Sequence, residues 1–184
     1  MEGAKIKTMF IAKQHSALSA FTYDIFDTWG HLVGELRWPD FAVANNARLK
    51  SLVPAGLTTK IQLTYQQRVY DIAFEYLTRD WYNDIRFFLK DGDTTLAIAD
   101  SIGVKKLFKQ PVIMLKTPFE GLLKRTSGLF SARYTLISDG AALGTVAEKR
   151  GLQVKRELFI DLPDTISPQI QIFIFFLVCN QSYR

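Results

Sequence analysis

Short apolar runs, rich in β-branched and aromatic side chains, recur along most of the chain with turn-forming residues between them. Such runs are typical of β-strands, and many of them at regular spacing predict a barrel or a sandwich. Helical patterns are sparse, with a short helix expected at 41–52 and a further helical turn at 103–108. We predict strands at 20–26, 32–38, 60–65, 69–76, 85–90, 94–99, 111–116, 129–138, 142–148 and 152–161. The fold is therefore expected to be mainly β.

Three of the predicted hairpins resemble one another in sequence. Gly30 and Gly140 each follow an apolar strand, and each is followed four residues later by a second glycine, Gly34 or Gly144. Residues 87–99 form a degenerate third copy. The pattern indicates one hairpin unit used repeatedly, although tight turns by themselves also favour recurring glycine.

The most hydrophobic segment, 170–179, lies just before a polar tail. It is apolar on every face, and it has only about half of the roughly 20 residues that a helix needs to cross a bilayer. We therefore expect a core element that protein surrounds on all sides, whether helix or strand. Its Ile, Phe and Val favour a strand, whereas Ser167 and Pro168 together form a good helix start.

Length and composition predict one domain. The chain has 184 residues and is 48% apolar, which is enough for a substantial core. We expect a single domain that spans residues 1–184. The N-terminal apolar piece at 9–12 is too short for a signal-peptide core, and the single cysteine, Cys179, fits a reducing compartment. We expect a cytoplasmic protein, either free or peripheral to a membrane.

Positive charge is concentrated in one part of the chain. Residues 101–156 contain eleven Lys or Arg and three acidic residues, although the net charge of the whole chain is only +5. A surface with this bias attracts anions such as lipid headgroups or nucleic-acid backbones, provided that the side chains converge. The alternative is the ordinary solvated exterior of a basic protein.

No residue pattern indicates an active site. Cys179 lies in the most apolar segment without a basic neighbour in the sequence, so we expect a buried, unreactive thiol. His15 and His31 are expected at the surface, because we find no second His, Cys or carboxylate at a metal-ligand spacing from either. The glycines form no phosphate-binding loop.

Asp80 and Asp84 are four residues apart, so in a helix they would share one face as an acid/base or metal pair. The flanking Arg79 and Arg86 favour surface ion pairs instead. We therefore expect no catalytic residue, no metal ion and no cofactor, and a protein that is not an enzyme.

Three motifs suggest a family. The chain contains YDIFD at 23–27 with Gly30 and Gly34, GTVAEK at 144–149, and LFIDLP at 158–163 before the apolar segment. Together they resemble the Tubby C-terminal-like superfamily, in particular its phospholipid scramblase and LURP-one-related branch. The resemblance implies a closed antiparallel barrel of about 12 strands around a hydrophobic C-terminal helix.

The chain also departs from scramblases. Their acidic loop before the last helix shrinks here to Asp161 and Asp164, which supply too few oxygen ligands for calcium. The cysteine-rich palmitoylation tract and the proline-rich arm of scramblases are missing as well. These departures argue against a role in lipid flipping.

We therefore expect a non-enzymatic barrel that binds anionic phospholipid headgroups, such as a phosphoinositide, at a membrane surface. Charge density, not a matched motif, selects the candidate residues Lys105, Lys106, Lys109, Lys124 and Arg125. The alternatives are a scaffold for a protein partner, an enzyme with a cavity beside the central element, and nucleic-acid binding, for which the aromatic residues form no stacking platform. The oligomeric state stays open.

Overall fold

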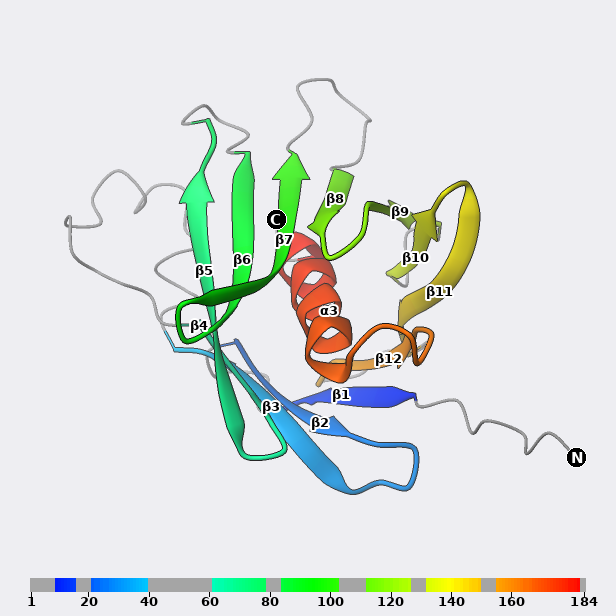
Figure 1. Ribbon diagram of the computed structural model, residues 1–184. Helices are drawn as coiled ribbons and strands as arrows, with labels where there is room; N and C mark the ends of the chain where they lie inside the picture. The colour runs from blue at the N-terminus through cyan, green and yellow to red at the C-terminus, as the bar shows by residue number, and fades with distance from the viewer. Residues whose placement is uncertain are drawn as a thin grey trace, which may run out of the picture.

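Twelve antiparallel strands form a closed barrel, in which consecutive strands are neighbours and β1 pairs with both β2 and β12 (Figure 1). The computed structural model describes residues 9–15, 21–39, 61–78, 84–102, 112–126, 132–149 and 155–182. Its elements are β1 (Phe10–Gln14), β2 (Phe21–Phe26), β3 (Leu32–Trp38), β4 (Ile61–Tyr65), β5 (Arg68–Tyr76), β6 (Ile85–Asp91), β7 (Thr94–Ile102), β8 (Val112–Thr117), β9 (Gly121–Arg125), β10 (Arg133–Ser138), β11 (Ala141–Glu148), β12 (Glu157–Asp161) and α3 (Pro168–Ser182). The predicted barrel is confirmed.

Alternation of buried and solvent-facing side chains forms the wall of the barrel. In β2, for example, Phe21, Tyr23 and Ile25 point inward and are at most 2% exposed, while the residues between them face outward. Each of the ten predicted strands overlaps one of these elements, but β1 and β9 were not predicted. The predicted helical segments at 41–52 and 103–108 lie outside the described residues.

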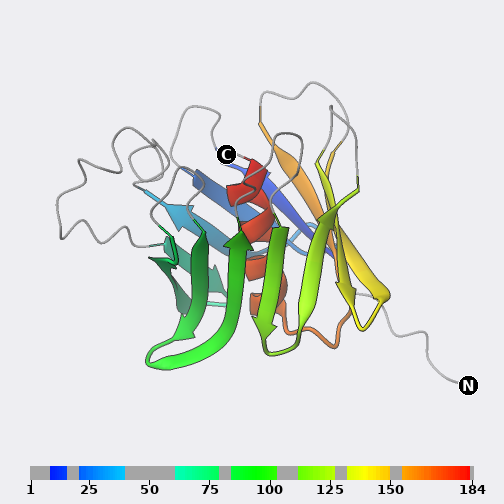
Figure 2. The ribbon, with the colours of Figure 1, turned by 90° about the horizontal axis from the view of Figure 1, so that it is seen from above.

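Helix α3 runs through the interior of the barrel and carries the apolar segment (Figure 2). Residues 172–179 are each at most 1% exposed, so strands cover the helix on every side. The Phe176 ring packs edge-on against Phe21 and Phe87, with centroid distances of 5.9 and 5.4 Å, and Phe175 packs against Tyr23 at 5.1 Å. The expectation of an enclosed core element is therefore confirmed.

The segment is helical because a closed barrel has no strand edge to pair with it. A helix satisfies its own backbone N–H and C=O groups, whereas an unpaired strand in an apolar interior would leave them without partners. The helix begins at Pro168, where the sequence predicted a start. The Gln171 side-chain amide donates to the carbonyl of Ile166 at 2.8 Å, which secures the first turn to the connection from β12.

The barrel has two distinct ends. At one end, here called the turn end, the strands are joined by the short connections 27–31, 66–67, 92–93, 118–120 and 139–140, and 162–167 leads into the helix. At the opposite end, the loop end, lie the far ends of the same strands. The helix also ends at the loop end. A hydrogen bond of 2.9 Å locates it there, in which the Ser101 hydroxyl near the end of β7 donates to Oε1 of Gln181.

The repeated hairpins of the sequence are repeated in the fold. The hairpins β2–β3, β6–β7 and β10–β11 each contain a turn glycine with positive φ, at Gly30, Gly92 and Gly140, and each contains a register shift. They are spaced four strands apart around the barrel. Gly34 and Gly144 occupy equivalent positions, where a Cβ would overlap a carbonyl oxygen of the next strand.

We predict that Gly144→Ala lowers the free energy of unfolding by about 1–3 kcal/mol, because the new Cβ forces the backbone of β12 to move. Gly121→Ala is the matched control, since the three atoms nearest to its Cβ all belong to side chains, those of Leu136, Phe119 and Leu115 at 3.1, 3.2 and 3.5 Å. Urea denaturation of both variants measures the difference. Equal losses in the two variants would contradict the close approach of β11 and β12.

Candidate functional site

The structure describes two of the five predicted headgroup residues, Lys124 and Arg125. Lys105, Lys106 and Lys109 lie outside the described residues. Lys124 is exposed on the outside of β9, whereas Arg125 has the inward orientation of its cross-strand partner Tyr134, which is 3% exposed. Because successive residues of a strand point to opposite faces, Lys124 and Arg125 lie on opposite faces of β9.

Lys124 belongs to a basic and apolar surface on the outside of β8, β9 and β10, here called the outer wall. Three of its side chains are cationic, and most of the others are apolar. The outward-facing residues of the outer wall are Val112, Met114, Lys116, Leu122, Lys124, Arg133, Thr135 and Ile137. None of these residues is acidic.

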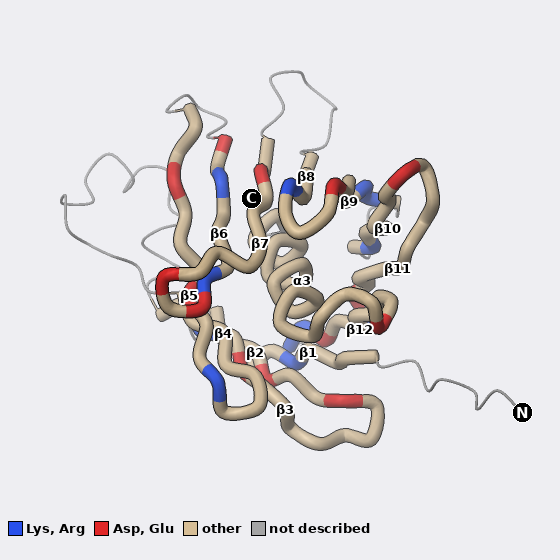
Figure 3. The backbone as a smooth tube through the Cα atoms, in the orientation of Figure 1, with Lys and Arg blue, Asp and Glu red and all other residues tan. Residues whose placement is uncertain are grey.

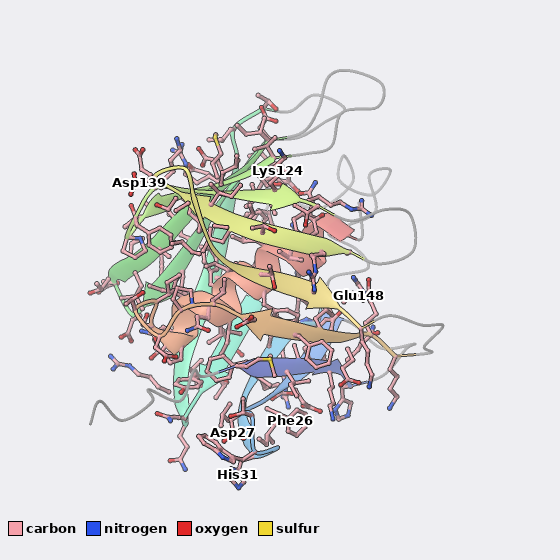
Figure 4. The ribbon with its side chains drawn as sticks, turned by 90° about the vertical axis from the view of Figure 1, so that its right-hand side faces the viewer. Phe26, Asp27, His31, Lys124, Asp139 and Glu148 are labelled. Carbon is pink, nitrogen blue, oxygen red and sulfur yellow. The ribbon has the colours of Figure 1, made fainter. Side chains whose placement is uncertain are left out.

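Strand register brings the outer-wall residues together. Ile137 pairs with Leu122, and Leu122 pairs with Met114, so an apolar row crosses all three strands. Lys124 pairs with Thr135 on the loop-end side of this row. Val112 and Leu122 are each 36% exposed, which makes them two of the most exposed large apolar residues that the structure describes. Figure 4 faces this side of the barrel, with Lys124 on β9, Asp139 at the turn end and Glu148 at the loop end.

Carboxylates lie around the outer wall but not on it. Asp100 of β7 pairs with Met114 at the edge of the wall, and its carboxylate accepts two hydrogen bonds from Arg86, at 2.7 and 3.0 Å. Glu120 and Asp139 occupy the turns at the turn end. In Figure 3, Lys and Arg appear along β8, β9 and β10, while acidic residues appear in the turns that join them. The outward-facing residues of the wall are therefore all cationic or uncharged.

The turn end has the opposite charge. Its six connections contain five carboxylates and no Lys or Arg. The five are Asp27, Asp93, Glu120, Asp139 and Asp164. An anionic surface would therefore be repelled from this end and attracted to the outer wall.

The interior of the barrel becomes polar at the loop end. Ser101 and Gln181 are 2% and 7% exposed, and the hydrogen bond between them fixes the orientation of the Gln181 amide. Nε2 of Gln181 and Nε of Arg125 are both buried and have no hydrogen-bond partner among the described residues. A buried donor without an acceptor costs about 1–3 kcal/mol.

Cys179 has a basic neighbour that the sequence did not reveal. The Arg156 guanidinium lies close enough to act electrostatically on the thiol, and its Nε also donates to Glu148 at 2.7 Å. Burial nevertheless raises the pKa of the Cys179 thiol to about 12, although Arg156 and a hydrogen bond from Tyr23 act in the opposite direction. The thiol is therefore protonated at neutral pH and fully buried.

Both histidines are exposed, as expected, but each lies beside a carboxylate. Nδ1 of His15 is 3.3 Å from Asp24, and Nδ1 of His31 is 3.0 Å from Asp27. Burial acts to raise the pKa of Asp27, but hydrogen bonds from the backbone and side chain of His31 and from the backbone of Trp29 lower it overall. Among the described residues, no three His, Cys, Asp or Glu side chains are grouped to hold a metal ion.

Arg86 forms ion pairs, as expected, and Arg79 lies outside the described residues. Arg86 pairs with Asp100 and, at 3.8 Å, with Glu75. The cross-strand register explains this choice, since Arg86 of β6 lies between Glu75 of β5 and Asp100 of β7. Asp80 lies outside the described residues, so a pair with Asp84 stays a prediction.

Comparison of the chain with models of protein families, with curated proteins and with solved structures found no match. In the part of the chain that the structure describes, every helix is too short or too polar to cross a bilayer. The geometry of the site is therefore the basis for the function proposed below.

We predict that Cys179 makes the folded protein less stable at high pH. Below the unfolded-state pKa of about 8.5 the thiol is protonated in both states and has no effect. As the pH rises toward about 12, the unfolded chain loses this proton while the folded chain keeps it, so the free energy of unfolding falls. The decline is at most about 1.4 kcal/mol per pH unit.

Urea denaturation of the wild type and of Cys179→Ala between pH 8 and pH 10.5 tests this prediction. The substitution changes the stability at every pH because it leaves a cavity, so the slopes are compared and not the absolute values. We expect a shallower decline in the variant. Parallel curves would show that the thiol is not held protonated in the folded protein.

Proposed function

We propose that the protein is a non-enzymatic lipid-binding barrel, which attaches to anionic phospholipid headgroups, such as a phosphoinositide, through the outer wall. The observation that carries the proposal is the composition of this wall, with Lys116, Lys124 and Arg133 around an apolar row and no carboxylate among its outward-facing residues. The attachment is peripheral, on the cytoplasmic side of a membrane.

The outer wall matches the chemistry of a membrane interface. Lys and Arg contact the phosphates, and each contributes about 1 kcal/mol near an anionic surface. Their aliphatic stems, together with Val112, Met114 and Leu122, can enter the boundary between headgroups and acyl chains. The acidic turn end favours an orientation in which it faces away from the membrane.

We also propose kinship with the Tubby C-terminal-like superfamily, in its scramblase and LURP-one-related branch. The enclosed C-terminal helix and the twelve-stranded barrel support this proposal, because they are the fold that the sequence resemblance implies. Lys105, Lys106 and Lys109 belong to the proposal through their charge and their place in the sequence between β7 and β8.

Charge reversal on the outer wall tests the function. We expect Lys116→Glu with Lys124→Glu to weaken binding to vesicles that contain phosphatidylserine or a phosphoinositide by at least tenfold, since two contributions of about 1 kcal/mol are lost. Co-sedimentation at several salt concentrations measures the affinity, and neutral phosphatidylcholine vesicles give the background. Raised salt should weaken binding of the wild type.

The matched control is Lys13→Glu with Lys90→Glu, which makes the same change in net charge on β1 and β6. Each of these lysines lies over an aromatic ring, and neither belongs to the outer wall. Equal loss of binding in the two double variants would show that net charge alone is responsible. Undiminished binding of the outer-wall variant would contradict the proposal.

A triple reversal, Lys105→Glu with Lys106→Glu and Lys109→Glu, tests the remaining candidates separately. We expect it to weaken vesicle binding while leaving the thermal unfolding temperature nearly unchanged. Single-stranded DNA is added as a competitor in the same assay. Competition at equimolar DNA would favour nucleic-acid binding instead.

A second candidate function, a scaffold for a protein partner, is favoured by the hairpin β2–β3. Trp29 and Leu32 are 65% and 63% exposed, more than any other large apolar residue that the structure describes. Asp27 accepts hydrogen bonds from the backbone of Trp29 and His31, at 2.9 and 2.8 Å, which fix the backbone of the turn that carries Trp29. Tryptophan is enriched among the residues that contribute most to binding at protein interfaces.

Trp29→Ser distinguishes the two functions. Because the hairpin lies at the acidic turn end, we expect this variant to bind anionic vesicles as well as the wild type does. Loss of vesicle binding in Trp29→Ser would place the membrane contact at the turn end and contradict the orientation proposed here.

A further inference from the structure

At the loop end of the barrel interior, Gln181 and Arg125 each have a buried hydrogen-bond donor that lacks an acceptor among the described residues. Nε2 of Gln181 is held away from Ser101, because Oε1 of the same amide accepts the Ser101 hydroxyl at 2.9 Å. Nε of Arg125 is also buried and lacks an acceptor among the described residues. Gln181 is 7% exposed, so bulk water does not reach most of this side chain.

Strand register places Arg125 two strands away from Ser101, to which Gln181 is hydrogen-bonded. Ser101 of β7 pairs with Ile113 of β8, which pairs with Leu123 of β9, and all three side chains point inward. Ser101 and Leu123 are thus two strands apart, a separation of about 10 Å. Arg125 is the next inward position beyond Leu123 toward the loop end, and Gln181 approaches the same row from the helix.

We propose that Arg125 and Gln181 form an interior binding site for a phosphate group at the loop end of the barrel. Both donors need an acceptor, and Arg125 adds a positive charge, so a phosphate oxygen suits the site better than a cation or an apolar group. The phosphate is either a free ion or part of a headgroup. The site is separate from the outer wall and does not depend on lipid binding there.

The opposite end of the helix provides a matched control. Gln171 is buried like Gln181, at 1% exposed against 7%, and it also has one buried polar atom without a partner among the described residues. That atom is Oε1, an acceptor, whereas the Gln171 amide nitrogen donates to backbone carbonyls of Ile166 and Pro163. A phosphate would find no free donor there.

Thermal unfolding and calorimetric titration with sodium phosphate, against sodium chloride at equal ionic strength, test the site. We expect phosphate to raise the unfolding temperature of the wild type, because it binds only the folded state. Arg125→Met and Gln181→Met should bind phosphate at least tenfold more weakly, while Gln171→Met should bind it as the wild type does. Glycerophosphoinositol is titrated in parallel, and tighter binding than that of phosphate would identify a lipid headgroup as the source.

Two results would overturn the proposal: no phosphate-specific shift in the wild type, or the same affinity in all four proteins. Should Gln181→Met fail to fold, NMR of the wild type gives an independent measurement. Phosphate should then shift the side-chain N–H resonances of Gln181 and Arg125 and leave those of Gln171 in place. Unchanged Gln181 and Arg125 resonances would equally contradict the site.

Discussion

The apolar character of α3 on all of its faces is the constraint on which the rest of this structure depends. A helix with one apolar stripe can lie against a sheet, but Ile172, Phe173 and their successors through Cys179 need cover in every direction. A sheet closed on itself provides that cover and leaves no strand edge exposed. The barrel and the helix therefore stabilise each other, because the wall would enclose an empty space without the helix and the helix would be insoluble without the wall.

Closure of the barrel also determines which surfaces can bind other molecules. Since every strand pairs on both sides, interaction with other molecules depends on outward-facing side chains or on the two ends, and not on strand addition. The short connections of the turn end carry carboxylates, while Lys116, Lys124 and Arg133 lie on the outer wall. This separation of charge gives the barrel a preferred orientation toward an anionic surface.

Much of this fold could be predicted because its signals are local. Alternating side chains and turn glycines identified ten strands, and uniform hydrophobicity identified the enclosed segment. The helical state of that segment was harder to predict, because Ile, Phe and Val favour strands. Ser167 and Pro168 indicated a helix start, and the absence of a free strand edge decides for a helix. Strands β1 and β9, with the sequences FIAKQ and GLLKR, have apolar residues followed by polar ones, so they lack the alternation that predicts a strand. Long-range interactions such as that between Arg156 and Cys179 arise because the closed barrel surrounds the helix. The residues next to Cys179 in the sequence do not reveal them.

Hydrogen exchange of the α3 backbone amides tests the enclosure of the helix most directly. If the barrel surrounds the helix, the amides of residues 172–179 exchange only when the whole protein unfolds, so their opening free energy equals that measured by urea denaturation. The account would be contradicted if these amides exchanged while the strands stayed protected, with opening free energies far below the global value. Such a result would show that the helix lies outside the barrel.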